Sequence, residues 1–212
     1  MAKIEVGETL GIRGTLDVSG GTVTLKDDQV PRAKLAREDN SVLTIPLTNL
    51  RVHDAVMTEL PNAAANDDLG VVMATWNTDA PTCQAGDIGG TASTRYAFFS
   101  HRITEDWILG ETMTIRFYAG MLTTVADTSC TLDLECYVNN GDGTVGSDIC
   151  ATAVQDINSV TLANKDFTIT PGSISNGDEL LFRIAIAYSD TGDAGVMIPE
   201  IGSIKMLRDI RP

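Results

Sequence analysis

Two histidines, His53 and His101, are the candidate general bases at neutral pH, because imidazole is the side chain whose charge changes near pH 7. Ser100 directly precedes His101. The sequence offers this pair no recognisable acid partner and contains no Gly-x-Ser-x-Gly turn. His101 has the same parity as Phe99 and Ile103, which predicts a position in a strand. We therefore expect His101 to be a hydrogen-bonded structural residue.

Paired carboxylates are the other residues that could do chemistry. Glu105 and Asp106 are adjacent, as are Asp27 and Asp28. A glycosidase holds two carboxylates about 5–10 Å apart across a sugar. Both pairs stand beside predicted turns or caps, and no other feature supports hydrolysis. The sequence predicts no catalytic residue, and we do not expect an enzyme.

The stretch Asn139–Thr144, followed by Asp148, gathers oxygen-bearing side chains of the kind that calcium binds. Its spacing does not match an EF-hand loop, because counting Gly143 as the sixth position places Val138 first. Asparagine, aspartate and glycine together are typical of the connection in a β-hairpin. We therefore interpret this stretch as a hairpin loop and predict no metal ligand and no cofactor.

Four cysteines, Cys83, Cys130, Cys136 and Cys150, include no Cys-x-x-Cys pair, so a zinc site is not expected. We interpret them as free, buried thiols. One disulfide stays open: Cys136 and Cys150 are symmetric about Gly143 and would face one another if a simple hairpin closes there.

Aromatic side chains bear on sugar binding, because saccharide sites usually present exposed Trp or Tyr faces. Trp76 and Trp107 are the only tryptophans, and aromatic residues make up 5% of the chain. Trp107 follows two acidic residues, and we expect it to be buried at one end of a sandwich.

Strands must position these side chains. Apolar residues alternate with polar ones through Met113–Met121, Leu132–Val138 and Leu180–Tyr188, which is the period of a half-buried strand. About eight such segments, separated by clusters of Gly, Asp, Asn and Ser, predict an all-β fold, an antiparallel β-sandwich of the jelly-roll type. The alternation predicts that Ile184 is in the core and that Glu135 faces solvent. A charge swap at Glu135 is therefore expected to change the stability of the fold little. Only Cys150–Ser159 is expected to be a short helix.

A different pattern marks residues 1–40, which we interpret as an extended, glycine-rich β-arm and linker before the sandwich of residues 41–212. Residues 1–51 carry seven basic and seven acidic side chains, so the remaining residues carry the whole net charge of −14. Glu38–Ser41 is interpreted as a polar hinge. Apolar doublets and a basic cluster form the predicted attachment and trimerisation surface, which consists of Leu10, Ile12, Leu16, Val18, Val23, Leu25, Arg32, Lys34 and Arg37.

Charge and hydropathy argue against nucleic-acid, membrane and secretory roles. A pI near 4.3 argues against nucleic acid as the main partner, because phosphate binding needs clustered Lys and Arg. No apolar run approaches the length of a membrane span, and none follows Met1 as in a secretory leader. We expect synthesis in a host cytoplasm and no membrane partner.

Three stretches together resemble virion structural proteins of tailed bacteriophages: Ile45–Arg51 with Asp54-Ala55 and Leu60-Pro61, Asp67–Gly70, and Gly177–Leu180 through Ile201–Leu207. The resemblance covers about residues 45–210. It implies a head decoration (cement) protein, a homotrimer that binds the major capsid protein on the outer surface of the head through its N-terminal arm. The alternative is a receptor- or carbohydrate-binding tip domain of a trimeric fibre, whose partner would be a host-surface glycan.

Overall fold

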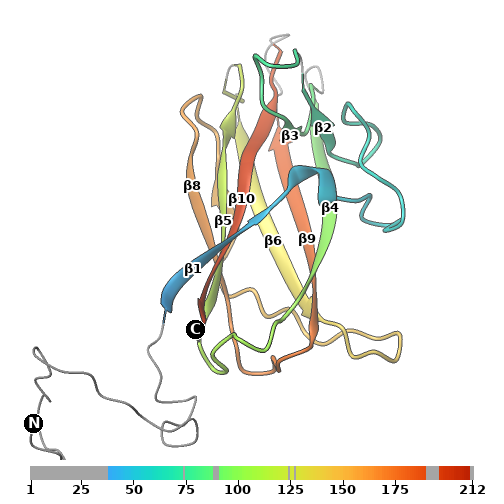
Figure 1. Ribbon diagram of the computed structural model, residues 1–212. Coiled ribbons are helices and arrows are strands. Elements are labelled where there is room, and N and C mark those ends of the chain that lie inside the picture. Colours follow the sequence, from blue (N-terminus) through green and yellow to red (C-terminus); the bar gives the residue numbers. More distant parts are fainter. Residues whose placement is uncertain are drawn as a thin grey trace, which may run out of the picture. The chain divides into compact units, whose positions relative to one another are not determined.

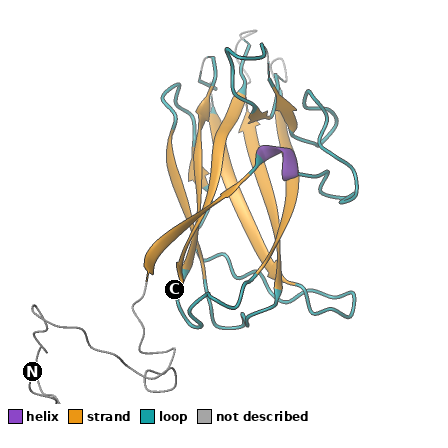
Figure 2. Ribbon diagram, viewed as in Figure 1, coloured by secondary structure: helices purple, strands orange, loops and turns teal. Residues whose placement is uncertain are grey.

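The computed structural model describes residues 38–73, 75–87, 91–123, 125–126, 128–189 and 196–210, with side chains from residue 41 onward. All of them lie in one compact unit, Ala36–Pro212. They form strands and a single turn of 3-10 helix (Figures 1 and 2). The elements are β1 (Glu38–Ile45), η2 (Leu47–Asn49), β2 (Gly70–Val72), β3 (Thr82–Gln84), β4 (Ala92–Arg102), β5 (Met113–Met121), β6 (Ser129–Val138), β7 (Gln155–Asp156), β8 (Ala163–Ile169), β9 (Glu179–Ser189) and β10 (Pro199–Ile210).

Two antiparallel sheets pack face to face. One has the order β2-β3-β10-β5-β8, with β1 also paired to β10, and the other has the order β4-β9-β6-β7. If β3 to β10 are taken as the eight strands of a jelly roll, their sheet orders are those of its two interlocked Greek keys. The predicted all-β jelly-roll sandwich is therefore confirmed, with β1 and β2 added to one sheet.

The core lies between the sheets and follows the predicted period of two. Alternate residues of β5 and β9 have almost no exposed surface, Ile184 among them. The rings of Phe99 and Phe182 stack with centroids 4.5 Å apart, and Trp107 is completely buried, as predicted. Burial of these apolar side chains is the main term that stabilises the sandwich.

Strand β1 begins beside the end of β10, where Glu38 pairs with Ile210. Figure 1 shows β1 crossing β10 from that end of the sandwich. The predicted hinge over Glu38–Ser41 is therefore wrong, because these residues are the first half of β1, with a register irregularity between Glu38 and Ser41. Backbone pairing to β10 outweighs the local polar composition.

The predicted helix over Cys150–Ser159 is also wrong. This segment runs along the edges of both sheets: Leu132 pairs with Gln155, and Ala151 N donates to Thr168 O at 2.8 Å. It satisfies edge groups of β6 and β8 that a helix would leave unpaired. None of the described residues forms a helix with the length and apolar character that a membrane span requires.

Candidate functional site

The predicted attachment residues, Leu10 to Arg37, lie outside the described residues. The other sequence candidates are described. His101 lies in β4 and is half-buried, whereas Ser100 is exposed on the opposite face. Burial, and then the charge of Arg208, lower the pKa of His101. Its Nε2 has no hydrogen-bond partner among the described residues, so His101 is a strand histidine but not the hydrogen-bonded one expected.

The stretch Asn139–Thr144 is a hairpin loop, as predicted. Asn139 bridges Val145, and Asn140 N donates to Thr144 O at 3.1 Å. Asp142 accepts hydrogen bonds from the backbone N and the hydroxyl of Thr144 at 2.9 and 2.6 Å, which lower the pKa of Asp142. Both hydrogen bonds go to Oδ1 of Asp142 and close the turn of the loop.

The strongest candidate site is a cleft on the outer face of the four-stranded sheet. Its volume is about 250 Å³. Strand pairing explains its composition, because Phe98, Arg183 and Glu135 lie directly across β4, β9 and β6 in one row. In the next row, Leu181 of β9 lies opposite Tyr137 of β6. Two aromatic rings and a leucine thus lie beside one carboxylate and one guanidinium, on a face that strand patterns usually leave polar.

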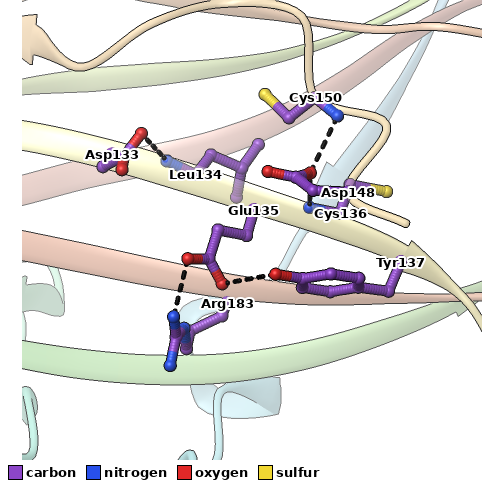
Figure 3. A network of polar contacts seen from close by, with 8 residues as sticks. All are labelled: Asp133, Leu134, Glu135, Cys136, Tyr137, Asp148, Cys150 and Arg183. Carbon is purple, nitrogen blue, oxygen red and sulfur yellow. Dashed lines mark hydrogen bonds and ion pairs between the residues drawn. The ribbon is translucent and has the colours of Figure 1, made fainter. Parts of the chain in front are cut away.

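Glu135 joins the polar groups of the cleft into one network (Figure 3). Its Oε1 lies 2.6 Å from Nη2 of Arg183, and its Oε2 accepts a hydrogen bond from the hydroxyl of Tyr137 at 3.1 Å. The guanidinium of Arg183 also lies 5.3 Å from the centre of the Tyr96 ring. Burial, and then the hydrogen bond to Glu135, raise the pKa of Tyr137. The network holds the Tyr137 and Arg183 side chains in fixed orientations.

One wall of the cleft comes from the excursion between Arg51 and Leu69, which covers the free edge of β4 (Figure 1). Arg51 and Phe98 exchange two backbone hydrogen bonds of 2.8 and 2.9 Å. At the other end of the excursion, Tyr96 receives a hydrogen bond from Leu69 N at 2.9 Å. His53 follows Arg51, and its ring lies over Tyr96 with centroids 4.6 Å apart. Both ends of the wall are therefore fixed to consecutive outward positions of β4.

A second hollow, of about 410 Å³, lies at the β2–β3 edge beside Glu200. Glu200 is 6% exposed, and burial raises the pKa of its carboxyl. The lining residues include Thr82, Gln84 and Leu122 but, among the described residues, no aromatic ring. This hollow has fewer of the features of a ligand site than the cleft.

Sequence reasoning singled out His53 but not the aromatic and aliphatic residues that line the cleft. A signal was present, since Phe98 and Leu181 are large apolar residues at the parity opposite to the core positions Phe99 and Phe182. Tyr137 likewise stands at a polar position of β6. Side chains of this kind on an outward face indicate a binding surface once the strands are known to be neighbours.

No protein-family model matches the chain, and no curated protein matches it. Comparison with solved structures finds the xylan-binding module CBM15, with a TM-score of 0.39 at 11% identity over 80% of this chain and 97% of that one. A carbohydrate-binding module specific for non-crystalline cellulose, CBM28, gives 0.37 at 11% identity over 73% and 85%. Infectious bursal disease virus, Gt strain, gives 0.33 at 13% identity over 67% and 38%. All three TM-scores lie below 0.5, so the functions of these proteins are not transferred to this chain.

Proposed function

We propose that the sandwich is a non-catalytic saccharide-binding domain and that the cleft on the outer face of β4, β9 and β6 is its site. The observation that carries this proposal is the row of Phe98, Arg183 and Glu135, with Tyr137 beside it. A sugar ring has apolar C–H faces and a rim of hydroxyls. It therefore fits a surface on which aromatic rings flank a fixed donor and a fixed acceptor.

Each side chain has a part in this recognition. Phe98 and Tyr137 offer ring surface to the C–H face of a sugar. Arg183 donates to hydroxyl oxygens, and Glu135 accepts from hydroxyl protons. Because these two groups already bind each other at 2.6 Å, little side-chain entropy is lost when a ligand arrives.

The size of the cleft limits the ligand. A volume of about 250 Å³ lies at the lower end of ligand pockets, which usually span roughly 300–1,000 Å³. It suits one sugar unit, with neighbouring units of a chain passing over the sheet. Affinity per site would then be modest, and display in several copies would raise the avidity of binding.

Binding to a panel of immobilised glycans, followed by calorimetry with the best ligand, tests this function. Tyr137→Ala is expected to weaken binding at least tenfold. Tyr118→Ala is the matched control, because Tyr118 is 44% exposed on the other sheet. Equal losses in the two variants, or no glycan bound by the wild-type protein, would contradict the proposal.

A second function concerns where this domain is displayed. We propose a decoration protein on the outer surface of a tailed-phage head, trimeric and bound to the major capsid protein through its N-terminal arm. The partition of charge favours it: residues 1–51 sum to zero, and the rest carry −14. An acidic surface repeated around a shell limits cross-linking between particles. Saccharide binding is compatible with this location, since the sandwich would face the host.

Removal of residues 1–37 tests the second function and leaves β1 complete. The shortened protein is expected to stay soluble and rich in β-structure, yet to lose binding to undecorated capsids. Light scattering of the full chain is expected to give the mass of a trimer. Full decoration of capsids by the shortened protein would place the attachment surface on the sandwich instead.

A further inference from the structure

The excursion that forms the wall of the cleft also brings three metal-binding side chains together. His53, Asp54 and Asp68 each offer one ligand atom, and these atoms lie within 4.8 Å of one another. His53 and Asp68 are fifteen positions apart in the sequence. They meet because Arg51 bridges Phe98 and Asp68 bridges Tyr96, two outward positions of the same strand.

Two of these atoms face each other without a direct bond. Nδ1 of His53 lies 3.7 Å from Oδ1 of Asp68, beyond the roughly 2.7–3.2 Å of an N–H···O hydrogen bond. Both atoms are shielded from solvent, and neither has a hydrogen-bond partner among the described residues. Each unpartnered buried polar atom needs an explanation, and a species that bridges these two atoms would supply one for both.

The distance suits an ion between them. Zinc binds histidine nitrogen and carboxylate oxygen at about 2.0–2.2 Å, so two ligands at a tetrahedral angle are roughly 3.3–3.6 Å apart. The observed 3.7 Å is close to this range. A single cation would satisfy both buried atoms at once.

Electrostatics points the same way. Three carboxylates gather around one imidazole, because Asp67 also lies 3.8 Å from Nε2 of His53, beside Asp54 and Asp68. A divalent cation would stabilise the ionised carboxylates and offset the cost of gathering them.

We propose that His53, Asp54 and Asp68 bind a divalent transition-metal ion of the zinc class. One imidazole and two carboxylates favour zinc or manganese over calcium, which prefers oxygen ligands throughout. Three protein ligands leave at least one position for water or for a ligand oxygen. The ion ties the two ends of the excursion together, and through the tilted ring contact of His53 with Tyr96 it fixes the wall of the cleft.

Calorimetric titration of the chelator-treated full chain with Zn²⁺ and Mn²⁺ tests the proposal, with thermal unfolding as a second readout. One strong site per chain and a rise in Tm of several degrees are expected for the wild-type protein. Asp68→Asn and His53→Gln are expected to lower the affinity at least tenfold. Asp54→Asn is expected to weaken binding as well, and because Asp54 is exposed this variant keeps its fold.

Two matched controls make the result specific. Asp67→Asn makes the same chemical change one residue from Asp68, at a carboxylate that lies 3.8 Å from the other ring nitrogen of His53. His101→Gln replaces the second of the two histidines in the chain. His101→Gln is expected to keep wild-type metal affinity. Asp67→Asn is expected to lose less affinity than Asp68→Asn, because a carboxylate at the other ring nitrogen of His53 orients that ligand without binding the ion.

Three outcomes would overturn the proposal. They are the absence of metal binding by the wild-type protein, equal losses in Asp67→Asn and Asp68→Asn, and equal losses in the two histidine variants. Destabilisation by Asp68→Asn with no effect of metal on the wild type would identify a histidine–carboxylate pair instead. Because no sugar is present in these measurements, they are independent of the proposed saccharide binding.

Discussion

Arg183 and Glu135 are direct neighbours across strands β9 and β6, with Nη2 of the guanidinium 2.6 Å from Oε1 of the carboxylate. The alternation of β6 correctly places Glu135 on the outer face. Its side chain is nevertheless only 26% exposed, because Tyr137 and Arg183 surround it. The expectation that a charge swap at Glu135 changes little therefore does not match its surroundings.

Substitutions at Ile184 and Glu135 are expected to lower the free energy of unfolding by different amounts, because Ile184 is in the core and Glu135 is on the outer face. Ile184→Asp places an unpaired carboxylate in the core and is expected to lower the free energy of unfolding by more than about 4 kcal/mol. Glu135→Lys sets a second cation beside Arg183 and is expected to cost about 1 kcal/mol, since the pair is partly solvated. Denaturant unfolding measures both values. Equal costs would show that the assignment of faces is wrong.

Reactivity of the four thiols is expected to be low in the folded protein. Burial raises the pKa of Cys83 and of Cys130 to about 12 and that of Cys150 to about 11, so little thiolate exists at pH 8. A chromogenic disulfide reagent is expected to react slowly, first at the half-buried Cys150, and with all four cysteines after denaturation.

Melting with and without reductant complements this measurement. The backbone N–H groups of Cys136 and Cys150 both donate to Oδ1 of Asp148 (Figure 3). The two thiols are nevertheless free and form no disulfide. The melting temperature is therefore expected not to depend on reductant. A drop of several degrees under reduction would show that these two cysteines pair.

Gly70 is expected to be essential for the position of the excursion that covers β4. A Cβ atom at Gly70 would lie 2.4 Å from backbone atoms of Ala63 and Ala64, so one of the two segments must move. Gly70→Ala is expected to cost on the order of 1–3 kcal/mol and to weaken ligand binding in the cleft. Gly172→Ala is the matched control, since a Cβ there meets nothing within 4 Å. Similar unfolding curves for the two variants would refute this role.

Acid sensitivity is expected from the bidentate pair of Arg116 and Asp166, joined by two contacts of 2.6 Å across β5 and β8. The hydrogen bond from Arg116 lowers the pKa of Asp166 in the folded state. The pair therefore contributes stability above the unfolded pKa of about 4, and this contribution is lost as the pH falls through the folded value.

Arg116→Met measures this contribution. Unfolding of the variant and of the wild type between pH 3 and 7 is expected to differ by less than about 1 kcal/mol at neutral pH, because the two side chains are 35% and 42% exposed. The difference is expected to shrink towards pH 3. A difference that is constant over this range would mean that Arg116 acts through packing alone.

The order of residues along the chain determines which side chains face the core. Alternation predicts these faces throughout β6 and β9 and in β5 as far as Ala119, since a strand turns successive residues to opposite sides. Turn residues predict the hairpin at Asn139–Thr144 in the same way, because the rules are local. The sandwich class follows from these two kinds of signal.

Only the tertiary structure decides which strands and loops are neighbours. Phe98, Glu135 and Arg183 form one row because β9 lies between β4 and β6, a pairing that no local pattern specifies. The meeting of His53 with Asp68 likewise depends on the free edge of β4. The segment at Cys150–Ser159 follows sheet edges rather than its own propensity. Backbone groups at an edge need partners, and distant parts of the chain supply them.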